Sequence, residues 1–270
     1  MKKSEKHIET KSFFRKFLPA GIQIVGPGIF LILTLAALLP EHVNAKNKAV
    51  LTYNLKYGII KGGEAKMIIT DTIFNGNKAI HYYMVGRTTG ITDKLFRVHN
   101  IYESIVDART FLPYKAIRNV REGNYKYFNE VFFFHSNDSI YSQRTGGIKV
   151  PHKLTDILSV FFYFVKQDYI NSVAKGKQLE LPVINGHDIS TIKIKHEGIQ
   201  TIDTSLGKVS AYILLPEIDK GRVLKSSDGL LFYISEKDKV PVLFDLDLRL
   251  GSLRAELSSY RLNGKEIKSF

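Results

Sequence analysis

Four carboxylates are the side chains best suited to acid–base chemistry in this sequence of 270 residues. Asp245 and Asp247 are two residues apart in a predicted strand, so their side chains should lie on the same face of it. If Glu103 or Glu122 converged on them, a carboxyl pair separated by about 5–5.5 Å or about 6.5–9.5 Å could hydrolyse a glycosidic bond. A strand with a polar outer face explains the two aspartates equally well, because apolar residues alternate with them.

Arginines offer a second kind of chemistry, the binding of an anion. Arg118 and Arg121 precede a predicted turn, and Arg87 and Arg97 lie upstream of them. Together these four guanidinium groups would suit a carboxylate or phosphate, which arginine binds in a bidentate manner. The alternative is a rim of surface salt bridges, since several acidic residues lie close to the same arginines in the sequence.

Motifs for nucleophilic, phosphate or metal chemistry are lacking. The sequence has no G-x-S-x-G, P-loop or H-E-x-x-H motif, and it contains no cysteine. Beyond residue 45 the histidines are scattered, and the closest pair, His187 and His196, is nine positions apart. We therefore assign no catalytic residue, expect no cofactor and no metal, and favour a non-enzymatic protein.

Aromatic side chains are densest between residues 125 and 164. They can form an ordinary core. In a half-open barrel the same side chains could line a pocket for an acyl chain, because ligand sites are concave and mostly apolar with a few polar groups. The candidate ligand-binding residues are Tyr127, Phe132, Phe134, Phe161, Phe162, Arg118 and Arg121.

Strands are the elements that must position these side chains. From Leu51 to Ile59 apolar and polar residues alternate, which predicts a strand buried on one face. Lys61-Gly62-Gly63 and Asn75-Gly76-Asn77 are predicted turns on either side of a return strand. Similar runs follow at 79–85, 101–106, 114–120, 125–134, 139–143, 187–195, 208–215, 230–235, 240–246 and 252–262. The pattern predicts a mainly β protein, either a single antiparallel, strongly curved sheet or a half-open barrel.

One segment has helical periodicity instead. Leu154–Tyr169 (LTDILSVFFYFVKQDY) places its apolar residues on one broad face, and Thr155 or Asp156 would be the N-cap. A helix so rich in Phe is unsuited to solvent. We expect it to pack against the concave face of the sheet.

The first 45 residues differ from the rest of the chain. A basic start is followed by an uncharged stretch, residues 17–39, then by Pro40 and Val43-Asn44-Ala45. This order predicts a secretory signal cleaved between Ala45 and Lys46. Residues 17–39 are also long enough to remain as an anchor in the inner membrane, although prolines and glycines dilute their first half. Both alternatives predict export to the periplasm or cell envelope, with membrane contact through this segment.

Residues 46–270 are predicted to form one β-rich envelope domain. Six of the 39 basic and three of the 26 acidic residues precede it, which leaves it a net charge of +10. This charge is spread along the chain. It fits a solvated surface or an anionic partner, such as a lipid headgroup or polysaccharide. Nucleic acid is not an expected partner, because the chain is predicted to be exported and has no Lys/Arg-rich run.

Four stretches together carry a resemblance to a known family. They are LTYNLKYGIIKGGEA at 51–65, IYESIVDARTFLP at 101–113, LTDILSVFFYF at 154–164 and LLFYISEKDKVP at 230–241, followed by Gly251-Ser252. In order and spacing they resemble the bacterial domain-of-unknown-function family 3108, proteins of the cell envelope. The chain has Tyr233 where that family often has Trp, and Lys166 where it often has Arg.

The resemblance implies an exported β-rich domain of uncharacterised role and supplies no catalytic residues. In outline such domains are similar to the half-barrel lipoprotein carriers of the periplasm, which is an analogy of fold alone. Three hypotheses of function therefore stay open. The domain could bind an apolar or lipid-like ligand or another envelope protein, serve as a purely structural or interaction module, or act on glycans through paired carboxylates.

Overall fold

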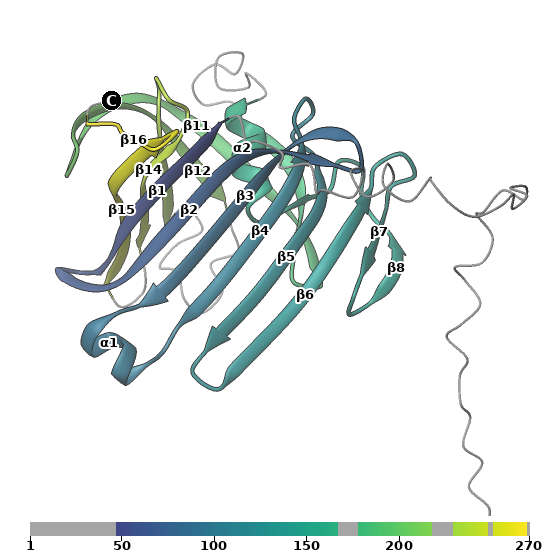
Figure 1. Cartoon of the computed structure of the whole chain (residues 1–270), viewed down its shortest axis with the longest axis horizontal. Coiled ribbons are helices and arrows are strands. Elements are labelled where there is room, and N and C mark those ends of the chain that lie inside the picture. Colours follow the sequence, from purple (N-terminus) through teal and green to yellow (C-terminus); the bar gives the residue numbers. More distant parts are fainter. Residues whose placement is uncertain (1–46, 167–177, 218–228, 248–250, 269–270) are drawn as a thin grey trace, which may run out of the picture. The chain divides into compact units, whose positions relative to one another are not determined.

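The computed structural model describes residues 47–166, 178–217, 229–247 and 251–268 (Figure 1). The predicted signal or anchor, including residues 17–39, Ala45 and Lys46, lies outside these ranges. The strands of the first half are β1 (Lys48–Tyr57), β2 (Ile60–Phe74), β3 (Asn77–Thr88), β4 (His99–Asp107), β5 (Pro113–Glu122), β6 (Tyr125–Phe134), β7 (Ser139–Ser142) and β8 (Gly146–Lys149). Those of the second half are β9 (Thr155–Asp156), β10 (Gln178–Asn185), β11 (Asp188–Thr204), β12 (Gly207–Glu217), β13 (Leu230–Ser235), β14 (Pro241–Asp247), β15 (Ser252–Leu262) and β16 (Lys265–Glu266).

All of these strands belong to one sheet, built from two meanders that meet at β1 and β15. From β1 the chain runs outward strand by strand to β8, and from β15 the neighbours run back in order to β10 and β9. Neighbouring strands are antiparallel, except that β9 is parallel to β10. No pairing joins β8 to β9 among the described residues, so the mainly β fold with one curved, unclosed sheet is confirmed.

The predicted strands are present, but one predicted turn is wrong. The first hairpin turns at Gly58-Ile59, and Lys61-Gly62-Gly63 lies within β2. Gly58 has a φ of +56°, which favours glycine. Gly63 is needed for a different reason, since a Cβ there would lie 2.6 Å from the carbonyl oxygen of Arg87 in β3. The turn at Asn75-Gly76 is confirmed, and both residues have the positive φ of a type I′ hairpin.

The predicted helix begins later than expected. The two helices of the described ranges are α1 (Gly90–Leu95), which was not predicted, and α2 (Ser159–Lys166). Thr155–Asp156, predicted as the N-cap region, forms strand β9 beside Val183 and Ile184. The Asp156 carboxylate still accepts hydrogen bonds from the backbone N–H groups of Leu158 (2.9 Å) and Ser159 (3.1 Å). Bonds to the N–H groups two and three residues on are those of an N-cap side chain, so Asp156 caps the turn that leads into α2, as predicted.

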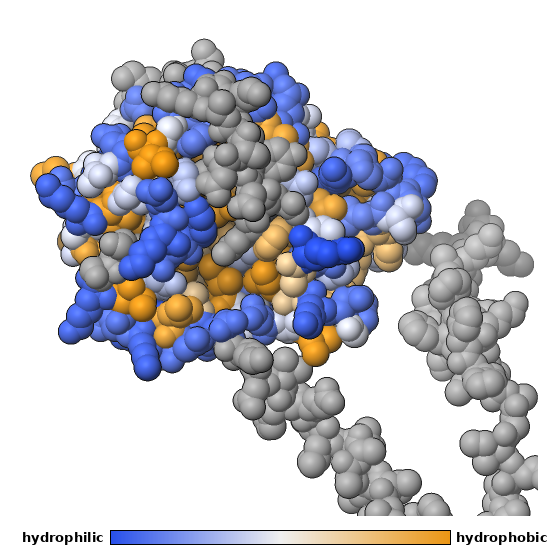
Figure 2. Space-filling view, turned by 90° about the horizontal axis from the view of Figure 1, so that it is seen from above, coloured by the Kyte–Doolittle hydropathy of each residue, from blue (hydrophilic) through white to orange (hydrophobic). Residues whose placement is uncertain are grey.

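Helix α2 lies between the two meanders, with buried side chains on all sides. Phe162 stacks on Tyr82 of β3 with ring centroids 3.9 Å apart. Phe161 stacks on Phe232 of β13 at 4.1 Å. Seen from above, apolar residues are visible in the centre of the molecule's face, and mostly hydrophilic residues, with some apolar ones, lie around them (Figure 2). The sheet thus curls around α2, and burial of Phe162 contributes about 1.5–3 kcal/mol.

Edge strands and short elements were the parts that sequence patterns missed. Strand β8 is only four residues long and begins with two glycines, and β10 contains Pro182. Both weaken the signal of a strand. Within the described ranges, no helix combines the length and apolarity that crossing a bilayer requires.

Candidate functional site

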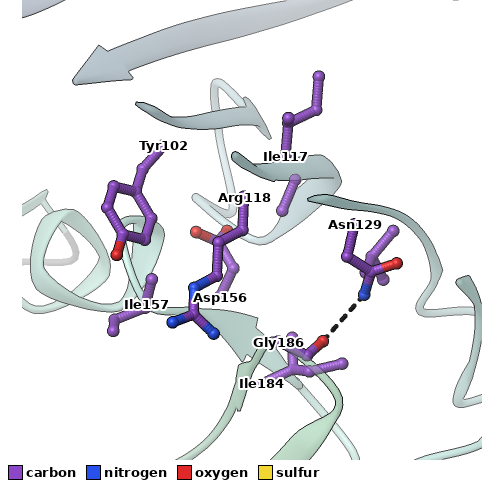
Figure 3. Close-up of a pocket in the computed structure, with 10 residues that line it drawn as sticks. Tyr102, Ile117, Arg118, Asn129, Asp156, Ile157, Ile184 and Gly186 are labelled. Atoms are coloured by element: carbon purple, nitrogen blue, oxygen red, sulfur yellow. Dashed lines mark hydrogen bonds between the residues drawn. The ribbon is translucent and has the colours of Figure 1, made fainter. Parts of the chain in front are cut away.

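The open end of the sheet meets the wall formed by β4, β5 and β6, and a small cavity lies at this seam (Figure 3). Its volume is about 20 Å³, which is room for about one water molecule. It is lined by Tyr102, Ala116, Ile117, Arg118, Asn129, Val131, Asp156, Ile157, Ile184 and Gly186.

Asp156 is the acidic group of the seam. Strand β9 places it opposite β4, where it accepts a hydrogen bond of 2.6 Å from the buried Ser104 hydroxyl. Burial raises the pKa of the Asp156 carboxyl above its ordinary value, although hydrogen bonds from Ser104 and Ser159 act in the opposite direction. Asp156 therefore takes up a proton more readily than an exposed aspartate does.

Arg118 and Tyr127 form the basic and aromatic part of the seam. The guanidinium of Arg118 lies 5.0 Å from the centre of the Tyr127 ring, and that of Arg144 lies 4.6 Å from the same ring. Such contacts contribute about 0.5–2 kcal/mol each, depending on exposure. Within the described ranges, the buried Arg118 Nε and Tyr127 hydroxyl have no hydrogen-bond partner. A single water in the adjacent cavity would have polar groups to bind.

Gly186 brings the turn between β10 and β11 against this wall. Its φ is +75°, and a Cβ there would lie 2.8 Å from Arg118 Nη1 and 3.0 Å from the Tyr127 hydroxyl. The Asn129 side chain donates a hydrogen bond of 2.9 Å to the Gly186 carbonyl oxygen and accepts one of 2.9 Å from the Ser142 hydroxyl. These contacts join the second meander to β5, β6 and β7 by side chains where backbone pairing ends.

The seven predicted ligand-binding residues do not lie at one site. Arg118 and Tyr127 reach the seam, whereas Phe161 and Phe162 belong to α2 in the interior. Phe132 and Phe134 are on the opposite face of β6 from the buried Tyr127, because an odd number of positions separates them from it. Arg121 is exposed on the outer face of β5 for the same reason. The distribution follows from strand periodicity, which could also have placed Asn129 beside Tyr127.

The predicted anion-binding arginines are also separated. Arg87 pairs with Glu64 at 3.5 Å and Arg97 with Asp93 at 3.1 Å, outside the seam that Arg118 lines. For Arg87 and Arg97, the structure therefore agrees with a rim of surface salt bridges and not with an anion site.

The predicted carboxylates lie on different parts of the sheet. Glu103 of β4 bonds His81 at 2.9 Å, and Glu122 of β5 bonds Asn100 at 2.6 Å. Asp245 of β14 pairs with Arg254 at 2.9 Å, and four strands separate β14 from β4 in the sheet order. No group of three His, Cys, Asp or Glu residues suited to a metal ion occurs in the described part of the chain.

Asp156 and Gly186 are, with Ser104 and Asn129, seam residues that the sequence analysis did not predict. Asp156 was considered only as a helix cap, and nothing in the sequence joined it to Ser104, 52 positions away. Gly186 precedes His187 in an ordinary turn signal. Its close contact with Arg118 depends on the curvature of the whole sheet.

Comparisons with known proteins give the fold and the family. No curated protein matches the chain. A solved structure, the β-barrel-like protein of domain of unknown function DUF1849 from Brucella abortus, is similar with a TM-score of 0.51 and 8% sequence identity. The likeness covers 81% of this chain and 98% of that one, and it concerns the fold alone. The profile described as "Protein of unknown function (DUF3108)" matches residues 52–258, and the chain therefore belongs to the DUF3108 family.

Proposed function

We propose that this chain is a non-enzymatic domain of the cell envelope, and that its half-barrel is a filled scaffold that presents its surface to a partner. The observation that carries the proposal is the place of α2. Phe162 stacks on Tyr82 at 3.9 Å and Phe161 on Phe232 at 4.1 Å, so ring contacts occupy the space between the two meanders.

A carrier of amphiphiles would need a different interior. Pockets for small molecules typically measure about 300–1,000 Å³. The cavity at the seam measures about 20 Å³, which is far too small for an acyl chain. An acyl chain could enter this scaffold only if α2 moved away from Tyr82 and Phe232.

Export is the second part of the proposal, and it rests on the sequence. The basic start, the uncharged residues 17–39 and the small residues before Lys46 support passage through the inner membrane. A domain without cysteine tolerates the oxidising periplasm. The separate, individually paired carboxylates support a non-enzymatic role.

The carrier function is the second candidate, and one observation favours it. Arg118 Nε and the Tyr127 hydroxyl are buried without a hydrogen-bond partner in the described ranges, on the wall that faces the second meander. A polar headgroup entering an opened seam would find both of them.

Ligand extraction from the purified protein separates the two candidates. We expect native mass spectrometry to find no bound lipid and a fluorescent fatty-acid probe to show no saturable binding. The matched control is Phe162→Ala, which should leave an apolar cavity between β3 and α2 that binds a small apolar ligand, as engineered core cavities do. A stoichiometric lipid in the unmodified protein, displaced by the fatty-acid probe, would refute the scaffold and favour the carrier.

A further inference from the structure

The turn between β1 and β2, helix α1 and the turn between β5 and β6 lie at the lower end of the sheet in Figure 1. The exposed apolar side chains of this end form what we call the apolar rim. It lies on the turn between β1 and β2, on α1 and its C-terminal end, and at the start of β6. Ile59 is fully exposed, Leu95 is 82% exposed and Ile91 is 75% exposed. The apolar rim comprises Ile59, Ile60, Ile91, Leu95, Phe96 and Tyr125.

We propose that the apolar rim inserts into the interface of an anionic lipid bilayer and so docks the domain on a membrane surface. The inference rests on the proposed function, since it names the partner that the scaffold presents its surface to.

Backbone hydrogen bonds hold the three parts of the apolar rim together. The Thr89 N–H donates to the Gly62 carbonyl oxygen at 3.0 Å, which ties α1 to the start of β2. The Gly123 N–H donates to the Arg97 carbonyl oxygen at 2.8 Å, which ties the turn between β5 and β6 to the segment after α1. A Cβ on Gly123 would lie 3.0 Å from the Phe96 ring, so the ring packs directly on this turn. The six side chains thus belong to one continuous end of the sheet.

Exposed apolar side chains at this density need a partner to remove them from water, because scattered single residues are ordinary but grouped ones mark interaction sites. Helix α1 has six residues, none of them buried, and its isoleucine and leucine side chains are exposed. Projecting turns fit a deformable interface better than they fit a flat protein surface. Tyr125 at the margin is also of the type enriched at membrane–water interfaces.

The charge around the apolar rim decides which partner fits. Arg121 of β5 and Lys126 of β6 are directly paired across the strands, and both are exposed. Two positive charges paired in this way repel each other. Arg121, Lys126 and Lys94 of α1 make no ion pair with a described residue. Of the acidic residues beside the rim, Glu64 pairs with Lys61 and Asp93 with Arg97, whereas Glu122 bonds the neutral side chain of Asn100. Three cations therefore remain beside the rim against one carboxylate. Unneutralised cations beside apolar tips suit anionic headgroups above an acyl layer.

A residue-specific probe tests insertion in the full chain, whose N-terminal segment could itself bind lipid. The sequence has no cysteine, so Leu95→Cys and Ile59→Cys each give one site for an environment-sensitive fluorophore. Ile199→Cys on β11, also exposed, is the matched control. With vesicles of phosphatidylglycerol and phosphatidylethanolamine we expect a blue shift with several-fold brighter emission at residues 59 and 95, and none at 199.

The charge requirement has its own control. Replacing Lys94, Arg121 and Lys126 by Gln should reduce partitioning to these vesicles, measured as the rim probe's response, by about 10- to 100-fold. The same change at Lys66, Lys208 and Lys265, which are exposed elsewhere, should reduce it much less.

Two outcomes would overturn the proposal. One is vesicle-bound protein whose probes at residues 59 and 95 stay unshifted, since the N-terminal segment alone would then hold it. The other is a shift that needs no lipid and grows with protein concentration, which would assign the apolar rim to a second copy of the chain. Neither result bears on the filled scaffold, which ligand extraction tests by looking for an internal lipid. The two proposals can therefore be refuted independently.

Discussion

Truncation of Phe162 to alanine is the sharpest test of the filled half-barrel. The Phe162 side chain is 2% exposed and stacks on Tyr82. Burial of about 150–250 Å² of an aromatic side chain at about 25 cal/mol per Å² gives an upper bound of about 4–6 kcal/mol. Phe→Ala changes in well-packed cores typically cost about 3–5 kcal/mol. We therefore expect Phe162→Ala to lower the free energy of unfolding by about 3–5 kcal/mol.

Phe134→Ala is the matched control, because Phe134 is 49% exposed on the outer face of β6. It should change the free energy of unfolding by less than about 1 kcal/mol. Urea unfolding followed by circular dichroism measures both variants, with the slope m reporting whether the exposed area has changed. A loss below about 1 kcal/mol for Phe162→Ala would show that α2 does not fill the interior, and the scaffold argument would be wrong.

Three further predictions concern the seam and the N-terminus. Gly186 and Gly76 both have φ near +75° to +80°, so alanine should cost the same backbone strain at either position. Only at Gly186 would the new Cβ also meet other atoms, so Gly186→Ala should destabilise the domain by about 1 kcal/mol more than Gly76→Ala does. Equal losses of stability would contradict the close contact. The pKa of Asp156 is raised in the folded state, so the folded protein holds that proton more tightly and loses stability as pH rises above the ordinary aspartate value of about 4. Urea unfolding between pH 4 and 7 should therefore show a smaller decline for Asp156→Asn than for the unmodified protein, and parallel profiles would count against the buried carboxyl. N-terminal sequencing of protein from the envelope should begin at Lys46, whereas an intact Met1 in membranes would favour the anchor.

The interior and the apolar rim lead to different expectations about lipid. In the interior, α2 occupies the space in which a bound acyl chain would have to lie, and its rings contact the sheet on both sides of the helix. The rim presents apolar side chains to the outside, beside cations that make no ion pair within the described part of the chain. A lipid-related role is therefore better supported at the end of the sheet than inside it.

Residue patterns alone predicted most of the strands, since a strand buried on one face must alternate apolar and polar side chains. They also located the Asn75-Gly76 turn, where only residues that tolerate positive φ fit a tight hairpin. The helical period near 159–166 was recognisable for the same local reason. The export signal is likewise a property of consecutive residues, and it stays a prediction.

Tertiary structure decided which strands pair and which side chains meet. The contact of β1 with β15 joins residues about 200 positions apart, and periodicity within each strand does not specify such a partner. The first turn lies at Gly58-Ile59, where Gly58 has a positive φ, and Gly63 lies within β2, where it allows the close approach of β3. The seam brings Arg118 and Asn129 of the first meander against Gly186 of the second, a contact that no local pattern specifies. Local pattern thus sets the face on which each side chain lies, whereas packing around the helix sets its neighbours.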